Sequence, residues 1–287
     1  NNDRVFESWT INMTSKSPTI KETPTQREQG IHTDYRYITL AVASPVILVL
    51  IWYTVVELGL ANPIILPSPV VIWQSLWEII FNGYSGSGIL VHIGASLYRV
   101  IVAFCAATVV GIFFGLLRGV YRDVNALLLV PAETIRPIPP LAFIPVFILW
   151  FGIGDLSKIL LIFYYVVLIV MLNTEAGVRS VPNDKIRAAH SLGANSRQTF
   201  AYVILPAALP HIMAGLRVAA AAAFSILVAS ELLGGDLGLG FVIMDAASFF
   251  RMPDVFVGIL LIGVLGFTWD RGLNYVFHRW VHWEGKI

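Results

Sequence analysis

The chain has little charge and a single cysteine. Of its 287 residues only 13% are charged, whereas 57% are hydrophobic, and the formal net charge is +1. Such a composition is too apolar for a soluble globular domain and indicates a protein that crosses a membrane several times. The one cysteine, Cys105, lies in an apolar run, so a disulfide or a cysteine-rich metal site within the chain is excluded. We expect membrane lipid around the chain and no nucleic-acid partner.

Motifs of enzymes are also missing. A Walker loop needs Gly-Lys followed by Ser or Thr, because backbone amides and the lysine together bind phosphates. The only Gly-Lys pair, Gly285-Lys286, is followed by Ile287. The sequence has no HExxH zinc motif and no GxSxG nucleophile motif. We therefore expect no catalytic residue, metal site or cofactor in this chain, and any ATP and Mg would be bound by another polypeptide.

Long apolar runs predict an all-α membrane protein with six spans. A bilayer core takes roughly 20 apolar residues of helix. The runs that approach this length are 37–60, 98–117, 125–151, 158–173, 212–230 and 255–269. Residues 1–36 are polar and rich in Ser, Thr and charge, which predicts a largely disordered cytoplasmic tail before a transmembrane domain at 37–287.

The segment between the first two spans, 61–97, differs from the spans. Prolines break its start, and Trp73, Trp77 and Ile80 mark an amphipathic helix suited to the membrane interface. With six spans, segment 61–97 and both termini lie on opposite faces of the membrane. Most Lys and Arg residues are on the face of the termini, whereas Lys158 and Arg251 are on the face of segment 61–97. Positive residues are retained in the cytoplasm, so both termini are predicted to be cytoplasmic.

A polar segment from Lys185 to Pro210 lies between the fourth and fifth spans, within a predicted cytoplasmic loop at about 175–210. The residue types predict a helix beginning at Arg187, a break at Gly193, and a second short helix ending at Leu205-Pro206. Two helices joined at a glycine would form a projecting knob that fits a cleft on a partner protein. The candidate docking residues are Arg187, Ala188, Ala189, His190, Ser191, Leu192, Gly193, Ala194 and Arg197.

This segment resembles the coupling loop of the permease subunits of bacterial ATP-binding-cassette (ABC) importers. The family pattern is EAA, three residues, Gly, nine residues, then Ile-x-Leu-Pro. Here the matching residues are Ala188, Ala189, Gly193, Leu205 and Pro206, while Arg187 replaces the Glu and Val203 replaces the Ile. The resemblance implies a type I importer transmembrane domain in the bacterial inner membrane. It also implies a second copy of this chain, two ATPase subunits that bind ATP and Mg, and a periplasmic or lipid-anchored solute-binding protein.

The third predicted span carries five prolines, several of them around Arg136, and must be broken. Broken backbone at membrane depth is tolerated where it is buried in protein or lines a wet cavity. The Arg-Pro-Ile-Pro-Pro stretch at 136–140 resembles that of permeases in the nitrate, sulfonate and taurine importer group. Arg136 forms either a structural ion pair with Glu133 or a positive element that attracts an anionic solute.

Several residues are candidates for the solute path. These are Arg136, Pro139, Arg217, Ser230 and Glu231. For Arg217, the alternative is a side chain that reaches the inner interface, and for Glu231, a helix-end carboxylate facing water. Glu231 opens the stretch ELLGGDLGLGF, whose glycines predict a tight outer turn. Small residues at helical spacing, such as Gly111 and Gly115, predict close helix packing.

Two other functions stay open. The chain could be a secondary transporter or channel with Glu133, Arg136, Arg217 and Glu231 as a buried ion or proton relay, or a membrane scaffold without a solute. Among solutes a small organic sulfonate such as taurine is favoured by the resemblance, and nitrate, bicarbonate, an aromatic carboxylate or a neutral pyrimidine remain alternatives.

Overall fold

The computed structural model describes residues 35–232 and 234–280. The chain divides into two units, one ending at Ile51 and one beginning at Trp52. Every regular element within the described ranges is a helix, which confirms the predicted all-α class. The predicted tail at 1–36 lies, except for its last two residues, outside the described residues.

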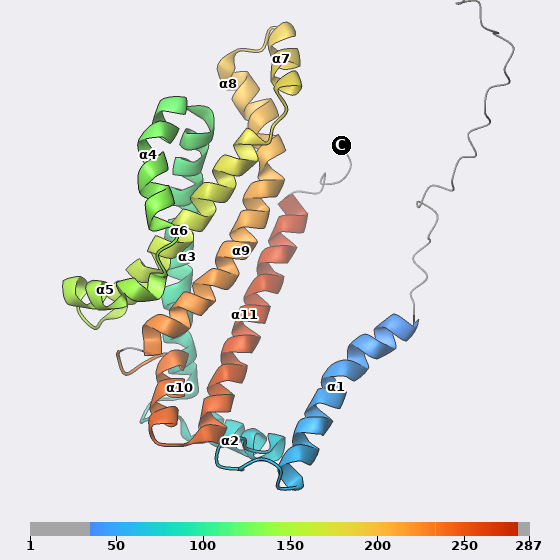
Figure 1. Ribbon diagram of the computed structural model, residues 1–287, viewed down its shortest axis with the longest axis vertical. Helices are drawn as coiled ribbons and strands as arrows, with labels where there is room; N and C mark the ends of the chain where they lie inside the picture. The colour runs from blue at the N-terminus through green and yellow to red at the C-terminus, as the bar shows by residue number, and fades with distance from the viewer. Residues whose placement is uncertain (1–34, 233, 281–287) are drawn as a thin grey trace, which may run out of the picture. The chain divides into compact units, whose positions relative to one another are not determined.

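Among the described residues, five helices are long and apolar enough to cross a membrane, and a bent pair of helices would make a sixth span. The five are α1 (Tyr35–Glu57), α3 (Ile89–Val120), α6 (Asp155–Arg179), α9 (Leu205–Leu232) and α11 (Met252–Trp280). The pair consists of α4 (Arg122–Ile135) and the segment formed by the 3-10 turn η2 (Pro140–Phe143) with α5 (Ile144–Phe151). The two arms meet at 88° (Figure 1), so the proline-rich third span is broken as predicted.

The second unit is built around α3, α6, α9 and α11, which run side by side (Figure 1). α6 packs between α3 and α9 over a core of Ala, Val, Leu, Ile and Phe side chains. Gly115 and Gly119 of α3 face Thr174 and Val178 of α6 so closely that a Cβ on either glycine would lie 2.5 Å from the opposing Cβ. The predicted small-residue stripe of α3 therefore serves packing within one chain.

The second span starts earlier than predicted. α3 begins at Ile89 instead of Tyr98 because His92, Ser96 and Arg99 continue the helix and are buried among partners from other segments. Before it, α2 (Pro69–Asn82) is the predicted amphipathic helix. Ser68 caps its first turn, Ile72 and Ile79 are buried, and Trp73 and Trp77 remain exposed on its other face.

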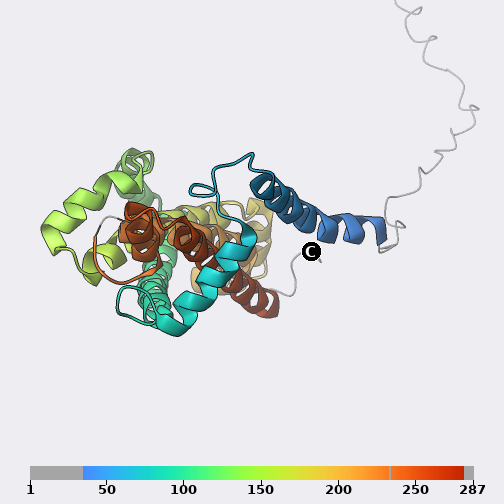
Figure 2. The ribbon, with the colours of Figure 1, turned by 90° about the horizontal axis from the view of Figure 1, so that it is seen from below.

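The two ends of the bundle carry different short helices. At one end lie α7 (Asn183–Ser191) and α8 (Ser196–Thr199), which join α9 through the π-turn η3 (Phe200–Ile204). At the opposite end, seen in Figure 2, α2 lies across α11 beside α10 (Leu239–Ser248). The sequence did not predict α10, because ten residues after a glycine-rich turn are too few to read as a span.

The helix after Gly193 does not end at Leu205-Pro206, as the sequence analysis expected. α8, η3 and α9 run on without a break, as one apolar helical stretch from Ser196 to Leu232. Pro206 lacks an amide donor, and the wider π-turn immediately before it absorbs the mismatch, with the Leu205 amide bonded to the Phe200 carbonyl. The short helix α8 is thus continuous with the span that contains α9.

Candidate functional site

The polar segment between α6 and α9 forms an elbow, residues 183–199, whose bend is set by local hydrogen bonds. α7 begins at Asn183, one turn before the predicted Arg187, and ends at Ser191. The amide of Ala194 bonds to the Ala189 carbonyl at 3.0 Å and that of Gly193 to the His190 carbonyl at 2.9 Å. These two bonds form a Schellman motif, which requires a left-handed residue, and Gly193 has φ +85°.

The second arm of the elbow begins with its own cap. The Asn195 side chain accepts a hydrogen bond from the Gln198 amide, and the Gln198 side chain accepts one from the Asn195 amide, each at 2.9 Å. This reciprocal capping box fixes the start of α8 three residues after the αL turn. The predicted break between two short helices is therefore confirmed, and short-range bonds determine its angle.

The elbow protrudes from one end of the bundle (Figure 1). No residue of α7, all of which is described, is buried. Leu192 at the bend is 90% exposed, and Arg187 forms an exposed ion pair with Asp184. An apolar side chain held at the tip of a rigid bend, with charges beside it, can insert into a pocket on another protein.

A buried ion cluster ties the elbow end of the bundle together. Arg118, which is 1% exposed at the end of α3, bonds to Glu175 of α6 at 3.0 Å and to Asn125 of α4. Arg179 bonds to the same glutamate at 3.2 Å, three residues before the chain turns toward α7. The cluster therefore joins α3, α4 and α6 at this end of the bundle.

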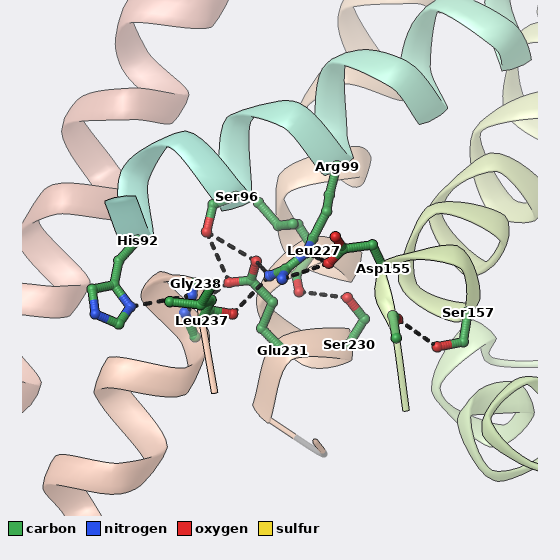
Figure 3. Close-up of polar contacts among 12 residues, drawn as sticks. His92, Ser96, Arg99, Asp155, Ser157, Leu227, Ser230, Glu231, Leu237 and Gly238 are labelled. Carbon is green, nitrogen blue, oxygen red and sulfur yellow. Dashed lines mark hydrogen bonds and ion pairs between the residues drawn. The ribbon is translucent and has the colours of Figure 1, made fainter. Parts of the chain in front are cut away.

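A second buried network lies at the opposite end, around Glu231 at the end of α9 (Figure 3). Arg99 of α3 donates to Glu231 at 2.5 Å, and its other nitrogens bind Asp155 of α6 at 2.7 Å. The Ser96 hydroxyl and the Gly240 amide each lie 2.9 Å from the Glu231 carboxylate. The carboxylate thus joins α9 to α3 and α10, and Arg99 extends the network to α6 through Asp155.

The same network holds the turn between α9 and α10. Arg99 donates to the Leu237 carbonyl at 2.8 Å, and the Leu239 amide donates to Ser96 at 2.9 Å. His92 accepts from the Gly238 amide at 3.3 Å, so its other ring nitrogen donates to the Tyr84 carbonyl. At Gly238, φ is +121° and a Cβ would collide with the Glu231 carboxylate, so the position requires glycine.

The alternative that Glu231 faces water is wrong, since its side chain is 1% exposed. Ser230 is buried too, and its hydroxyl donates to the Leu227 carbonyl at 2.7 Å. Sequence reasoning missed Arg99, although a lone arginine ten residues into an apolar helix already calls for a buried partner. Its partners lie 56 and 132 residues away, so spacing along the chain could not identify them.

A third polar cluster connects α2, α10 and α11 at the same end. The Tyr84 hydroxyl donates to Asp245 at 2.9 Å, Arg251 stacks over the Tyr84 ring, and Ser75 bonds to Asp254. Burial, and secondly the hydrogen bond to Asp245, raise the pKa of Tyr84 above its ordinary value. Tyr84 therefore stays neutral well into the alkaline range.

Arg136 lies at the break between α4 and η2 and lines an open groove of about 570 Å³. It pairs with Glu133 at 3.7 Å, and the two side chains are 64% and 50% exposed. The ion pair that was one of the two interpretations of Arg136 is therefore present, whereas the buried setting that the relay alternative needs is not found in the single chain. The groove is lined by Arg136, Tyr165, Leu168, Ile169, Leu172, Asn173, Ala176 and Val218.

The remaining predicted path residues are not gathered at this groove. Pro139 precedes η2, and Arg217 pairs with Asp270 of α11 at 3.8 Å, both side chains being 45% exposed. The four groups of the predicted relay therefore lie in three different ion pairs. Within residues 35–232 and 234–280, no three His, Cys, Asp or Glu side chains are grouped to hold a metal ion.

Comparisons with known proteins agree on one family. Residues 107–282 match the family described as "Binding-protein-dependent transport system inner membrane component". The taurine transport system permease protein of Escherichia coli (strain K12) is 38% identical, over 88% of this chain and 92% of its own. The nitrate import permease protein of Synechocystis sp. is 32% identical, over 74% and 78%. The fold resembles that of an inward-facing methionine ABC transporter, with TM-score 0.54 and 20% identity over 68% of this chain and 94% of the other.

Proposed function

Because the chain belongs to the family of inner membrane components of binding-protein-dependent transport systems, we propose that it carries a small anionic solute inward. The chain is a permease subunit of an ABC importer. The solute would be an organic sulfonate of the taurine type, released to the permease by a periplasmic or lipid-anchored binding protein. The working assembly would contain two copies of this chain and two ATPase subunits that bind ATP and Mg.

The exposed elbow is the observation that carries this proposal. Its bend is rigid by local hydrogen bonding, and Leu192 projects from it without a partner in the described part of the chain. Burying that side chain in an ATPase cleft would contribute about 2–3 kcal/mol. The docking residues would be Arg187, Ala188, Ala189, His190, Ser191, Leu192, Gly193, Ala194 and Arg197.

The mechanism would be alternating access driven through the elbow. ATP binding would draw the two ATPase subunits together, and the two elbows would follow as rigid attachments. Because α8 continues into α9, and Arg118 and Glu175 join the neighbouring helices, the movement would reach the far end of the spans. The bundle would then accept solute from outside, and hydrolysis would reset it.

The solute class is supported by relatives and by one feature of the groove. Relatives are named for taurine and for nitrate, both of which carry a negatively charged oxyanion group. Arg136, Pro139, Arg217, Ser230 and Glu231 were the candidate path residues, and of these Arg136 lines the groove. Ser230 and Glu231 would act indirectly, by holding the far ends of the spans together.

The elbow is tested by changing Gly193 in the complete transporter. Gly193→Val should weaken ATPase association and lower ATP-dependent uptake about tenfold or more, because a β-branched residue disfavours φ +85°. Gly193→Asn is the matched control, since asparagine tolerates this conformation and the space around the position is open. Both quantities are measured in reconstituted vesicles with the ATPase and the binding protein. Unchanged association and uptake in Gly193→Val would remove the elbow from the mechanism.

A further inference from the structure

We propose that the groove at the α4–α5 break recognises a zwitterionic aminosulfonate. Arg136, which lines the groove, would receive the sulfonate, and Glu133, which pairs with Arg136 beside the groove, would receive the ammonium group. This inference rests on the proposed function and adds to it the two residues that would recognise the opposite charges of such a solute. The site would lie on the solute path.

The ion pair between Arg136 and Glu133 lies deep along its span. Arg136 lies about 21 Å along the helix from Arg122, at 1.5 Å per residue, so it is far from the end of the span. Charged side chains at such depth face a wet cavity or other protein, because exposure to lipid costs several kcal/mol. Yet both members are half-exposed or more in the chain. Lipid is therefore disfavoured as the surroundings of the pair, and the open groove that Arg136 lines is a space in this chain that can hold water or a solute.

The ion pair is also long and exposed. The atoms that join Arg136 and Glu133 are 3.7 Å apart, which is longer than a charge-assisted hydrogen bond of about 2.8 Å. An exposed pair of this kind contributes little to stability, about 0–1 kcal/mol. Each charge is therefore available to a ligand at small cost.

The presence of Glu133 discriminates between solutes. A simple anion on Arg136 would be repelled by the neighbouring carboxylate. A zwitterion with a short spacer would instead place its ammonium group on Glu133 while its sulfonate takes the guanidinium. The adjacent opposite charges thus favour a dipolar solute over nitrate or a plain sulfonate.

The groove also offers uncharged donors. Asn173 uses one amide hydrogen on the Ile169 carbonyl at 2.8 Å and keeps a second for a ligand. Tyr165 lines the groove, and its hydroxyl makes no hydrogen bond to another described residue. Tyr165 and Asn173 thus offer hydrogen-bond donors at two levels of the groove that Arg136 also lines.

The test measures binding of two probes to the assembled transporter without its binding protein. The probes are 2-aminoethanesulfonate, which is zwitterionic, and ethanesulfonate, which lacks the ammonium group. Glu133→Gln should weaken the binding of 2-aminoethanesulfonate about tenfold or more. It should leave the binding of ethanesulfonate unchanged or make it tighter. Arg136→Gln should weaken the binding of both probes, and Tyr165→Phe should weaken the binding of both by a smaller factor. Glu78→Gln and Arg271→Gln, which change exposed charges away from the groove, should alter neither.

Each outcome decides one claim. Equal effects of Glu133→Gln on both probes, or no effect, would overturn the role of Glu133. Normal binding in Arg136→Gln would overturn the site itself. A wild-type transporter that binds only nitrate would overturn the solute class. If the wild type imports the aminosulfonate with ATP while every groove variant behaves normally, only this inference fails, whereas absence of ATP-dependent uptake in the wild type would refute the proposed function. Assembly with the ATPase serves as the folding check for every variant.

Discussion

Glu231 receives hydrogen bonds from Arg99, Ser96 and Gly240, which belong to α3 and α10. Removal of one member of a buried pair leaves the other charge without compensation, which costs about 3–5 kcal/mol. We therefore expect Glu231→Gln to lower the thermal unfolding midpoint of the purified protein strongly. Replacing both members, as in Arg99→Met with Glu231→Leu, should cost less than Glu231→Gln alone.

Asp155 provides the matched control for this prediction. It bonds to the same guanidinium at 2.7 Å, but its side chain is 55% exposed, so water can replace it. Asp155→Asn should lower the midpoint much less than Glu231→Gln. Equal losses for the two substitutions would mean that burial does not determine the strength of this network.

Tyr84 makes the stability of the far end depend on alkaline pH. Burial and the hydrogen bond to Asp245 raise the pKa of Tyr84 in the folded protein. In the unfolded chain a tyrosine ionises at about pH 10. A raised folded pKa contributes stability that is complete below about pH 10 and is lost as pH rises further. Between about pH 9 and 11 the unfolding midpoint of the wild type should fall more steeply than that of Tyr84→Phe. Parallel declines would exclude this linkage.

At the scale of elements, the seam between α3 and α6 depends on glycines. A Cβ at Gly115 would lie 2.5 Å from the Thr174 Cβ and 2.6 Å from the Met171 carbonyl oxygen, so Gly115→Ala must push the helices apart. We expect a cost of about 1–3 kcal/mol in unfolding free energy. Gly94→Ala on the same helix is the control, because the space around Gly94 is open. It should be neutral or stabilising by up to about 1 kcal/mol. A neutral Gly115→Ala would contradict close packing at this seam.

The elements that could be predicted are those determined by neighbours in sequence. The elbow depends on Gly193 and on the Asn195–Gln198 box, all within a few residues, and its break was predicted correctly. The start of α3 and the helix α10 were missed. Both depend on burial among distant residues, since His92 contacts Tyr84 and Gly238 from two other segments. A hydropathy pattern assigns such polar residues to a segment beyond the end of a span, although the fold buries them.

At the scale of the whole molecule, sequence predicted which residues could line a path but not which of them meet. Arg136 and Glu231 were grouped together because each is charged within an apolar region. The fold separates them, because a break of 88° turns α5 away from α4 and leaves Arg136 on a groove. Glu231 instead joins Arg99, which is 132 residues away. Only the packing of α3, α6 and α9 determines which charged residue becomes the partner of Glu231.

The orientation of the bundle in the membrane can be tested by labelling. The elbow must face the cytoplasm, because only there can it meet an ATPase. Cys105, which is exposed on α3, is the only cysteine, so Cys105→Ser gives a background without thiols. In this background Leu192→Cys marks the elbow and Phe249→Cys marks the opposite end, at positions 90% and 70% exposed. A membrane-impermeant maleimide should label Leu192→Cys only in inside-out vesicles stripped of ATPase, and Phe249→Cys only in right-side-out vesicles.

Val109→Cys serves as the control for exposure to lipid. Val109 is 71% exposed near the middle of α3, where an impermeant reagent should not reach it from either side. It should react only after denaturation in detergent. Labelling of Leu192→Cys in right-side-out vesicles would place the elbow outside the cell, where no ATPase could bind it. A permease driven through this elbow is therefore possible only if the two labels appear on opposite sides in the predicted order.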